Sequence, residues 1–532
     1  MRLSALCLPA SLLALAACTT PTTAPVENEA VEVATLTASA PNTVNGRTGL
    51  VPEQSGDAYY QSAAASVTAR AHGAPRGQAK NVILFVGDGM GISTITAGRI
   101  YAGQTRGLDG ESYRLAMETL PHMALSKTYA NDGQIADSAS TATAMTTGAK
   151  VNMRTLGITS DAPFGNCAAA LDHGTDSLFE LAEREGLATG VLSTARLTHA
   201  TPAATYSESA SRDWEDNTAF RGQDPGGCKD IAAQFIDWEA GDGFEVAMGG
   251  GRRHFLTDEI ADPENEGTTG KRTDGRDLTS EWTAKSPDHR VIYSLAGFEA
   301  TNFNSDTRVL GLFEPSHMQF DMDRPDDVLG EPSLADMTAA AITRLSRDPD
   351  GFVLMVEGGR IDHAHHAGNA ARAVTDTDAF DQAVAIALEM TSAEDTLIIV
   401  TADHSHTMTI AGYSRRNNPI LGKATSDTGE EVKGADGLPY TTLGYMNGPG
   451  SCAGREEGNA ACVRADLTNT DTTAPDFRQP ALIPMYSESH GGEDVAIFAS
   501  GPGSELVAGV MEQNEIFHVM GYASGLVAPA ED

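Results

Sequence analysis

Short apolar runs recur along the chain, each followed by a polar or glycine-rich stretch and then by a segment of helical periodicity. The runs cover residues 81–86, 190–193, 244–248, 351–356, 396–400 and 495–498, and helical patterns cover 177–185 and 373–389. Short continuous apolar runs are typical of strands that are buried on both faces. Their alternation with helices predicts an α/β fold with a large, mostly parallel central sheet flanked by helices on both faces.

Residue types that bind metals stand at the ends of these predicted strands. Those that follow a strand are Asp88, His199, Glu357, Asp362, Asp403 and His404, and His490 precedes one. The carboxyl ends of parallel strands form the edge of a sheet where sites are usually built. One Asp after a strand means little, because Asp is common in turns. Carboxylates and imidazoles after at least four strands indicate a single site.

The stretch 413–485 differs in composition from the rest of the chain. It is rich in Gly, Asn, Thr and Pro, which favours turns and irregular structure. We expect an insertion of irregular and short β structure at this position.

The N-terminal residues have the pattern of a targeting segment. Arg2 is followed by an apolar stretch that ends in Leu15-Ala-Ala-Cys18, similar to a bacterial lipobox. This predicts a signal peptide over 1–17, a lipid on Cys18 and a flexible tether over 18–56, which leaves 57–532 as the folded domain. The alternative is an ordinary signal peptide that happens to contain Cys18. The apolar run is too short to be a transmembrane helix.

Composition narrows the choice of partners. The chain carries 73 acidic and 36 basic residues, a formal net charge of -37. Such a surface repels nucleic acid and anionic membranes, so we expect no specific nucleic-acid binding and membrane contact only through a lipid on Cys18. From the signal segment we expect the protein to be exported to the periplasm or the cell surface of a bacterium.

Cysteine parity agrees with export. After loss of the signal peptide and lipidation of Cys18, four cysteines remain, an even number that suits an oxidising compartment. Three pairings are possible, and proximity favours Cys452–Cys462, which leaves Cys167–Cys228. Zinc binding by these thiols is a weaker interpretation because no CxxC pair is present.

Two pairs of ligand types and one histidine can build a metal site. Asp362 and His366 are four residues apart, so on a helix they would share one face. Asp403 and His404 are adjacent at a strand end, and His490 can complete a three-ligand site, the number that catalytic zinc usually takes from a protein.

A nucleophile is expected at Ser138. The segment from Ala136 to Ala149 looks like the start of a helix made of small residues, and Ser138 near its N-terminus would meet free N–H groups that favour a phosphate. The alternative role for Ser138 is that of a helix N-cap.

Six segments in register carry a family resemblance. VGDGMG, DSASTATA, THATPAATYSE, VEGGRIDHAHH, TADHSH and SHGGEDVAIFASGP, spread over about 79–525, closely resemble alkaline phosphatases, including the animal enzymes. The resemblance implies a central mixed sheet, a homodimer and a small crown region at 413–485. It also implies hydrolysis of phosphate monoesters through a phosphoserine at a site with two Zn²⁺ ions and one Mg²⁺ ion.

The resemblance also implies a role for each matching residue. Ser138 corresponds to the nucleophile and Arg212 to the arginine that grips two phosphate oxygens. The ligands implied for the first zinc are Asp362, His366 and His490. Those for the second zinc, which also coordinates Ser138, are Asp88, Asp403 and His404. Those for magnesium are Asp88, Thr201 and Glu357. His199, His363 and His406 surround these ligands. A weaker match implies a Ca²⁺ site at Glu264, Phe313, Glu314 and Glu331, where the last position is Asp in the animal enzymes; a surface acidic patch is the alternative. Cys167–Cys228 matches a disulfide of the family.

His199 and His363 are similar to the animal enzymes and unlike the enterobacterial type, which has Asp and Lys. This resemblance implies an alkaline optimum and a marked dependence on magnesium. A sulfatase is disfavoured because Ser138 lacks the Pro and Arg that sulfatases place after their nucleophile. A phosphodiesterase is disfavoured by Arg212, and a catalytically silent binding module by the complete ligand set.

Overall fold

The computed structural model describes residues 43–222, 225–451 and 464–528, which belong to one compact unit, Pro41–Asp532. The predicted signal peptide, the lipid site at Cys18 and the Cys452–Cys462 pair lie outside the described residues. Within the described ranges, no helix has both the length and the apolar character needed to cross a membrane.

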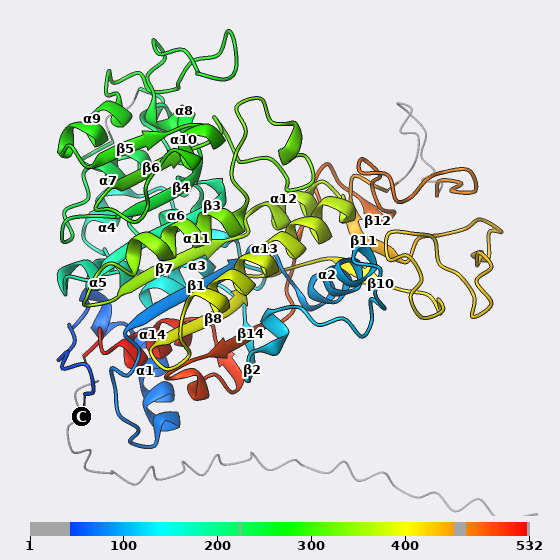
Figure 1. The fold of residues 1–532 in the computed structure, drawn as a ribbon, viewed down its shortest axis with the longest axis horizontal. Helices are drawn as coiled ribbons and strands as arrows, with labels where there is room; N and C mark the ends of the chain where they lie inside the picture. The colour runs from blue at the N-terminus through cyan, green and yellow to red at the C-terminus, as the bar shows by residue number, and fades with distance from the viewer. Residues whose placement is uncertain (1–42, 223–224, 452–463, 529–532) are drawn as a thin grey trace, which may run out of the picture. The chain divides into compact units, whose positions relative to one another are not determined.

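A ten-stranded sheet forms the centre of this unit, with strand order β15-β2-β14-β8-β1-β7-β3-β4-β6-β5 (Figure 1). Its strands are β1 (Asn81–Gly87), β2 (His122–Lys127), β3 (Ala188–Arg196), β4 (Val246–Gly250), β5 (His289–Ile292), β6 (Arg308–Leu312), β7 (Phe352–Glu357), β8 (Thr396–Ala402), β14 (Val495–Ser500) and β15 (Gly509–Glu512). The predicted α/β fold with a mostly parallel sheet is confirmed. All six predicted runs contribute to these strands, whereas β2, β5, β6 and β15 were not predicted.

One strand of this sheet runs against its neighbours. Among the described residues β14 pairs antiparallel with both β8 and β2, while the remaining ladders of the sheet are parallel. The amino end of β14 therefore lies at the edge where the parallel strands have their carboxyl ends. This is why His490, which precedes β14, can join residues that follow β1, β7 and β8.

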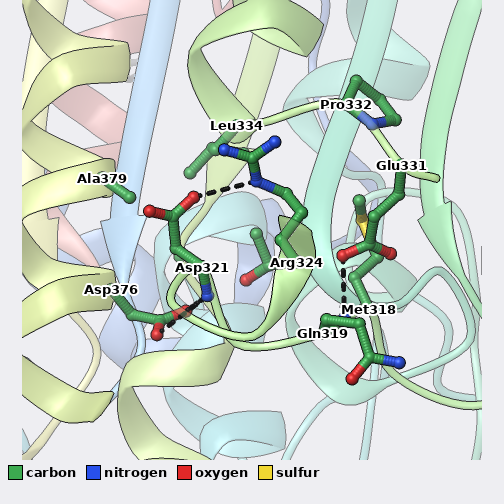
Figure 2. Close-up of a pocket in the computed structure, with 11 residues that line it drawn as sticks. Met318, Gln319, Asp321, Arg324, Glu331, Pro332, Leu334, Asp376 and Ala379 are labelled. Atoms are coloured by element: carbon green, nitrogen blue, oxygen red, sulfur yellow. Dashed lines mark hydrogen bonds and ion pairs between the residues drawn. The ribbon is translucent and has the colours of Figure 1, made fainter. Parts of the chain in front are cut away.

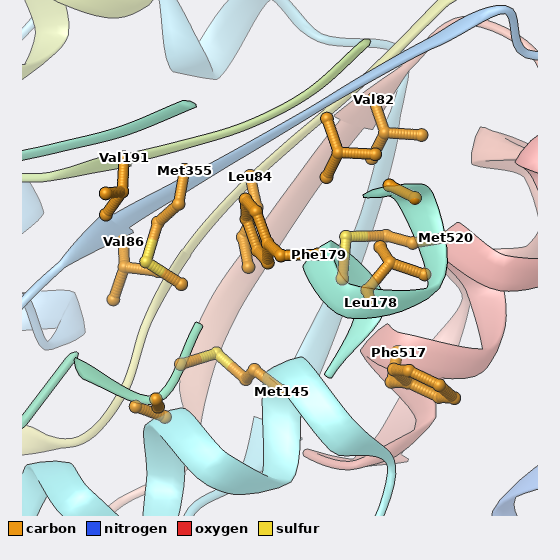
Figure 3. Close-up of a cluster of buried hydrophobic side chains, with 14 of the residues drawn as sticks. Val82, Leu84, Val86, Met145, Leu178, Phe179, Val191, Met355, Phe517 and Met520 are labelled. Carbon is orange, nitrogen blue, oxygen red and sulfur yellow. The ribbon is translucent and has the colours of Figure 1, made fainter. Parts of the chain in front are cut away.

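The core consists of two layers, one on each face of the sheet. The side chains of β1 alternate, so that Val82, Leu84 and Val86 belong to one buried cluster and Ile83 and Phe85 to the other. Figure 3 shows the first cluster, where these valines and Leu84 face residues of the covering helices. At roughly 1.5–3 kcal/mol for each fully buried large apolar side chain, these layers dominate the stability of the fold.

Helices cover both faces of the sheet. The first cluster includes residues of α1 (Ala58–Ala71), α3 (Ser138–Thr147), α5 (Leu178–Arg184) and α14 (Glu515–Ser524). The second includes residues of α2 (Ile92–Thr105), α11 (Leu334–Leu345) and α13 (Ala370–Met390). The predicted helices 177–185 and 373–389 correspond to α5 and α13. Their first turns are capped by the side chains of Ser177 and Asn369, which accept hydrogen bonds from backbone N–H groups.

The other helices are short and lie in the connections between strands. They are α4 (Cys167–Leu171), α6 (Ala200–Ala203), α7 (Ile231–Ile236), α8 (Arg252–Phe255), α9 (Leu278–Lys285), α10 (Leu295–Glu299) and α12 (Arg360–His366).

Two small sheets complete the fold. A three-stranded sheet consists of β10 (Met408–Ile410), β11 (Leu443–Gly448) and β12 (Ala481–Pro484), and a two-stranded sheet of β9 (Ser405–His406) and β13 (His490–Gly491). β11 and β12 lie within 413–485, where short β structure was expected. The pairing of β9 with β13 sets His490 opposite His406.

Residues 43–56, in the last part of the predicted tether, pack against the compact unit. The Leu50 N–H donates to the carbonyl of Leu526 at 2.8 Å. Gln54 is buried and donates to the carbonyls of Thr147 and Asp176. This stretch therefore lies with the domain in the structure.

The Cys167–Cys228 disulfide, predicted from the sequence, is present and joins positions 61 residues apart. Closing a loop of this length restricts the unfolded chain, so replacing both cysteines by serine is expected to lower the free energy of unfolding by about 2–4 kcal/mol. Calorimetry or guanidinium unfolding of the chelated proteins measures this difference. Dithiothreitol should lower the stability of the wild type by more than that of the double variant, which keeps only the predicted Cys452–Cys462 pair; equal stability of both proteins without reductant would contradict the prediction.

Candidate metal and phosphate site

The predicted ligand residues converge at the carboxyl edge of the central strands β8, β1, β7 and β3. Asp88 follows β1, Glu357 ends β7, and Asp403 and His404 follow β8. Three groups of metal-ligand side chains form here, each with its ligand atoms within 4.8 Å of one another. The groups are Asp362, His366, His406 and His490; Asp88, Asp403 and His404; and Asp88, His199 and Glu357.

Three ligand atoms of the first group have a regular spacing. Asp362 Oδ1 lies 3.3 Å from His366 Nε2 and 3.5 Å from His490 Nε2, and the two ring nitrogens are 3.2 Å apart. Ligands at about 2.0 Å from a tetrahedral zinc ion lie about 3.3 Å from one another. The three atoms therefore have the spacing of three corners of such a tetrahedron. Asp362 and His366 lie together on α12, as the sequence predicted.

Backbone carbonyls orient the two imidazoles of this group. His366 Nδ1 donates to the carbonyl of Glu488 at 2.6 Å, and His490 Nδ1 donates to the carbonyl of Ala136 at 2.8 Å. Each neutral ring then carries its proton on Nδ1 and a lone pair on Nε2. Two lone pairs 3.2 Å apart repel one another, whereas a cation between them would bind both. The donor set therefore fits a metal ion.

The second group surrounds His404 Nε2. This atom lies 3.4 Å from Asp88 Oδ1, 3.2 Å from Asp403 Oδ2 and 3.2 Å from Ser138 Oγ. All four residues are buried. Ser138 is the first residue of α3, and Asp137 is its N-cap, so the alternative role of Ser138 as the N-cap is wrong. The helix N-terminus brings unpaired N–H groups and a positive dipole end to the serine hydroxyl.

The environment of the Asp88 carboxylate is the clearest indication that this site binds cations. Neither of its carboxylate oxygens has a hydrogen-bond partner among the described residues, and the side chain is fully buried. Burial, followed by the charges of Asp403, Asp362 and Glu357, raises the pKa of Asp88 well above its usual range. A buried carboxylate without a partner is costly unless a proton or a cation neutralises it. Divalent ions in the second and third groups, both of which contain Asp88, would do so.

The third group joins Asp88 to Glu357 and His199. Burial raises the pKa of Glu357 to about 7, and the Ser193 hydroxyl donates to its carboxylate. Thr201 lies in α6 and is also fully buried. Carboxylate and hydroxyl oxygens suit magnesium, which prefers oxygen ligands.

Arg212 is held in place from two sides. One terminal nitrogen donates to Asp137 Oδ2 and the other to His199 Nε2, both at 2.9 Å. Its backbone N–H donates to the carbonyl of Arg154, whose own N–H donates to Asp137 Oδ1. Arg154 has a φ of 67°, in the left-handed region that few non-glycine residues adopt. Ser138, its cap Asp137 and Arg212 are thus tied into one unit.

The sequence prediction missed three residues of the site. Asp137 was passed over although it directly precedes Ser138, where an N-cap is expected. Glu488 stands two residues before His490 and accepts hydrogen bonds from His406 and Thr407. The ring of His317 lies 3.9 Å from that of His363 between centroids, and burial lowers the pKa of His363 to about 3. The positions of Asp137, directly before Ser138, and of Glu488, two residues before His490, could have pointed to these two residues. Nothing in the sequence around His317 links it to the site.

Two of the four predicted calcium residues, Glu264 and Glu314, lie in a separate acidic cluster. There the ligand atoms of Glu264, Glu314 and Asp327 lie within 4.8 Å of one another. Glu331, which the sequence prediction named, accepts a hydrogen bond at 2.9 Å from the backbone N–H of Gln319 (Figure 2). Burial, followed by the charge of Glu314, raises the pKa of Glu331 to about 9. The Phe313 carbonyl accepts a hydrogen bond from Arg252.

Comparison with known proteins agrees with this arrangement. The alkaline phosphatase family model matches residues 79–526. The tissue-nonspecific alkaline phosphatase of Gallus gallus is 41% identical over 491 residues, which cover 89% of this chain and 91% of the relative. The enzyme of Felis catus is 42% identical over 453 residues, 84% of this chain and 83% of the relative.

Solved structures share the fold. Alkaline phosphatase from Thermus thermophilus superposes with a TM-score of 0.60 at 24% identity and covers 90% of this chain and 96% of its own. The enzyme from the Antarctic bacterium TAB5 has a TM-score of 0.57 at 24% identity and covers 84% and 98%.

The fold and the ligand groups at the edge of its sheet define an α/β metallohydrolase. More narrowly, the chain belongs to the alkaline phosphatase family. It is a phosphomonoesterase, as the sequence motifs implied.

Gly89 is expected to be irreplaceable, because a Cβ at this position would lie 2.3 Å from Cδ2 of His406. Its φ of 68° adds backbone strain, and its N–H donates to Asp403 Oδ1 at 2.9 Å. Gly89→Ala should lower kcat/KM for a phosphate monoester by roughly 100-fold, because small displacements of ligands are costly for catalysis.

Gly107→Ala is the matched control. Gly107 has a φ of 71° and no atom within 4 Å of an added Cβ, so this variant carries the strain without the clash. It should lose some thermal stability and keep its activity. An active Gly89→Ala enzyme would show that His406 can move without harm to the site.

Proposed function

We propose that the chain hydrolyses phosphate monoesters through a phosphoserine on Ser138, at a site that holds two zinc ions and one magnesium ion. The observation that carries this proposal is the position of Ser138 Oγ, 3.2 Å from His404 Nε2, the same nitrogen that lies 3.4 Å from Asp88 Oδ1 and 3.2 Å from Asp403 Oδ2. The proposed ligands of the first zinc are Asp362, His366 and His490. Those of the second are Asp88, Asp403 and His404. Those of magnesium are Asp88, Thr201 and Glu357, with His199 and His363 beside them.

The chemistry of the chain's own residues follows from their positions. When bound, the zinc ions would supply positive charge that lowers the pKa of a hydroxyl and neutralises phosphoryl oxygens. Ser138 Oγ loses its proton and attacks phosphorus, the P–O bond to the leaving group breaks, and the released alkoxide takes up a proton from water as the phosphoserine forms. Water then attacks the phosphoserine, releases inorganic phosphate and restores the Ser138 hydroxyl. Two displacements in sequence give overall retention at phosphorus.

Arg212 recognises the phosphoryl group in this scheme. Its two terminal nitrogens are fixed by Asp137 and His199, which leaves their remaining N–H groups free to donate to two phosphoryl oxygens. The planar guanidinium suits this bidentate contact. A diester has fewer free oxygens, so Arg212 favours monoesters.

We further propose that the acidic cluster of Glu264, Glu314 and Asp327, with Glu331 and the Phe313 segment beside it, binds calcium. Burial raises the pKa of Glu314 to about 8, so a cation would relieve the repulsion within the cluster. Calcium accepts several oxygen ligands in a flexible geometry. Calcium should raise the melting temperature of the wild type and not that of Glu314→Gln; equal shifts would rule the site out.

Assembly and location are also proposals. A homodimer is supported by the family and by the exposed apolar side chains of Met446, Leu482 and Ile483 on β11 and β12. We propose that residues 1–17 are removed on export and that Cys18 carries a lipid, so that the domain lies in the periplasm or at the cell surface. The disulfide of the domain suits that compartment. Sedimentation analysis tests the dimer, and intact mass of the full chain tests the lipid.

Ser138→Ala should abolish monoester hydrolysis. With zinc and magnesium present, kcat for p-nitrophenyl phosphate is expected to fall by at least ~10³-fold, because the nucleophile is lost. Ser140→Ala is the matched control: Ser140 lies two residues further along α3 and its hydroxyl donates to Asp137, so activity should stay within a few-fold. A fully active Ser138→Ala enzyme would refute the phosphoserine mechanism, and a wild type that prefers bis-p-nitrophenyl phosphate would refute the preference for monoesters.

Metal removal gives an independent test. Chelation should lower the activity by at least ~100-fold, because the buried carboxylates lose their counter-charge and the hydroxyl its activation. Zinc alone should restore part of the rate, and magnesium the rest, most clearly at alkaline pH. Magnesium that changes neither the rate nor the pH profile of the chelated, zinc-reconstituted enzyme would contradict the third site.

A further inference from the structure

Glu488 lies at the centre of the hydrogen bonds that surround the first metal group. It is 1% exposed and stands just before β13. Its carboxylate oxygen Oε2 lies 2.5 Å from His406 Nδ1, and Oε1 accepts from the backbone N–H of Thr407 at 2.7 Å and from its hydroxyl at 2.6 Å. The Glu488 carboxylate is thus fixed by three donors from the segment that contains β9.

The side chain of Glu488 reaches Asp362 through one imidazole. His406 Nε2 donates to Asp362 Oδ1 at 2.7 Å, the same oxygen that lies near the ring nitrogens of His366 and His490. With a carboxylate at each nitrogen, His406 donates from both and is held between Glu488 and Asp362. The ring is fully enclosed, with 1% exposure. Movement of Glu488 would therefore turn His406 and release Asp362.

The backbone of Glu488 orients a second ligand. Its carbonyl accepts the proton of His366 Nδ1 at 2.6 Å, and its N–H donates to the carbonyl of His366 at 2.9 Å. These two bonds fix the ring so that Nε2 faces Asp362 and His490. Glu488 thus acts on Asp362 through its side chain and on His366 through its main chain.

We infer that Glu488 is a positioning residue that sets the geometry and the ion affinity of the Asp362–His366–His490 group. The inference rests on the proposed function, since it takes this group as a zinc site. Removing a residue that hydrogen-bonds to a metal ligand without touching the metal typically lowers metal affinity by about 10–100-fold. The side chain of Glu488 acts on Asp362 through His406, whereas its main-chain bonds to His366 stay in a side-chain variant. Replacing the carboxylate should therefore weaken the retention of one zinc ion and leave the other bound.

The test compares zinc affinity in the full chain, with zinc itself as the probe. Wild type and Glu488→Gln are loaded with zinc and titrated with a chromophoric chelator, which reads the released metal and not the activity. We expect one of the two zinc ions to bind about 10–100-fold more weakly in Glu488→Gln. Glu488→Asp keeps the charge, so it should recover part of the affinity, and it serves as the second variant if the amide does not fold.

Glu183→Gln is the matched control. Glu183 is likewise a buried glutamate, 4% exposed, held by the Thr189 hydroxyl and by the backbone N–H groups of Asp242 and Gly243. It lies on α5 and contacts Thr189 at the amino end of β3, whereas the ligand groups lie at the carboxyl ends of the parallel strands. This variant should lose thermal stability and keep the zinc affinity of the wild type.

The outcomes separate the inference from the function on which it rests. Equal zinc affinity in wild type and Glu488→Gln, or an equal loss in Glu183→Gln, would overturn the positioning role. A wild type that binds no zinc would instead overturn the proposed function. A selective loss in Glu488→Gln with partial recovery in Glu488→Asp would support the inference.

Discussion

The structure depends on an accumulation of negative charge that the chain buries at one edge of its sheet. Asp88, Glu357, Asp362 and Asp403 are all buried there, and both oxygens of Asp88 have no donor within the described residues. Carboxylates this close cannot all be ionised without cations among them. The protein keeps them because they follow rigid strands, where packing of the two core layers fixes their positions. Cation binding and the folded shape of this edge are therefore coupled.

The positive groups of the chain are arranged around this charge without cancelling it. Arg212 forms an ion pair with Asp137. Although burial opposes it, the charge of Arg212 lowers the pKa of the Asp137 carboxyl. His406 is engaged between Asp362 and Glu488; although burial opposes it, the hydrogen bonds to both carboxylates raise its pKa to about 10. Most of the charge near Asp88 and Asp403 stays available for ions. The residues that could neutralise the site are instead used to orient it.

The serine and the ligand groups meet because different kinds of element end at one place. The carboxyl ends of β1, β7 and β8 lie at this place together with the amino end of β14. The N-terminus of α3, which begins at Ser138, lies there too. The rings of His404 and His490 stack with centroids 3.6 Å apart, so the first two ligand groups are neighbours. A phosphoryl group at Ser138 would thus be within reach of both groups and of Arg212. Hydrolysis of a phosphate monoester is therefore explained by the joint position of Ser138, the two ligand groups and Arg212, and not by one residue alone.

The sequence by itself determined the fold class, the strands with continuous apolar runs and the ligand types, because burial on both faces and polar strand ends leave a local pattern. It missed β2, β5 and β15, whose residues are partly exposed and break that pattern, and also β6, which is buried but has only a short apolar run interrupted by Gly311. Local sequence also says nothing about which distant side chains meet. Only the tertiary structure set Glu488 against His406 and His366, brought Asp327 to Glu264 and Glu314, and turned β14 so that His490 joins the site. These contacts depend on strand direction and on loop packing, which are decided by the whole core and not by neighbouring residues.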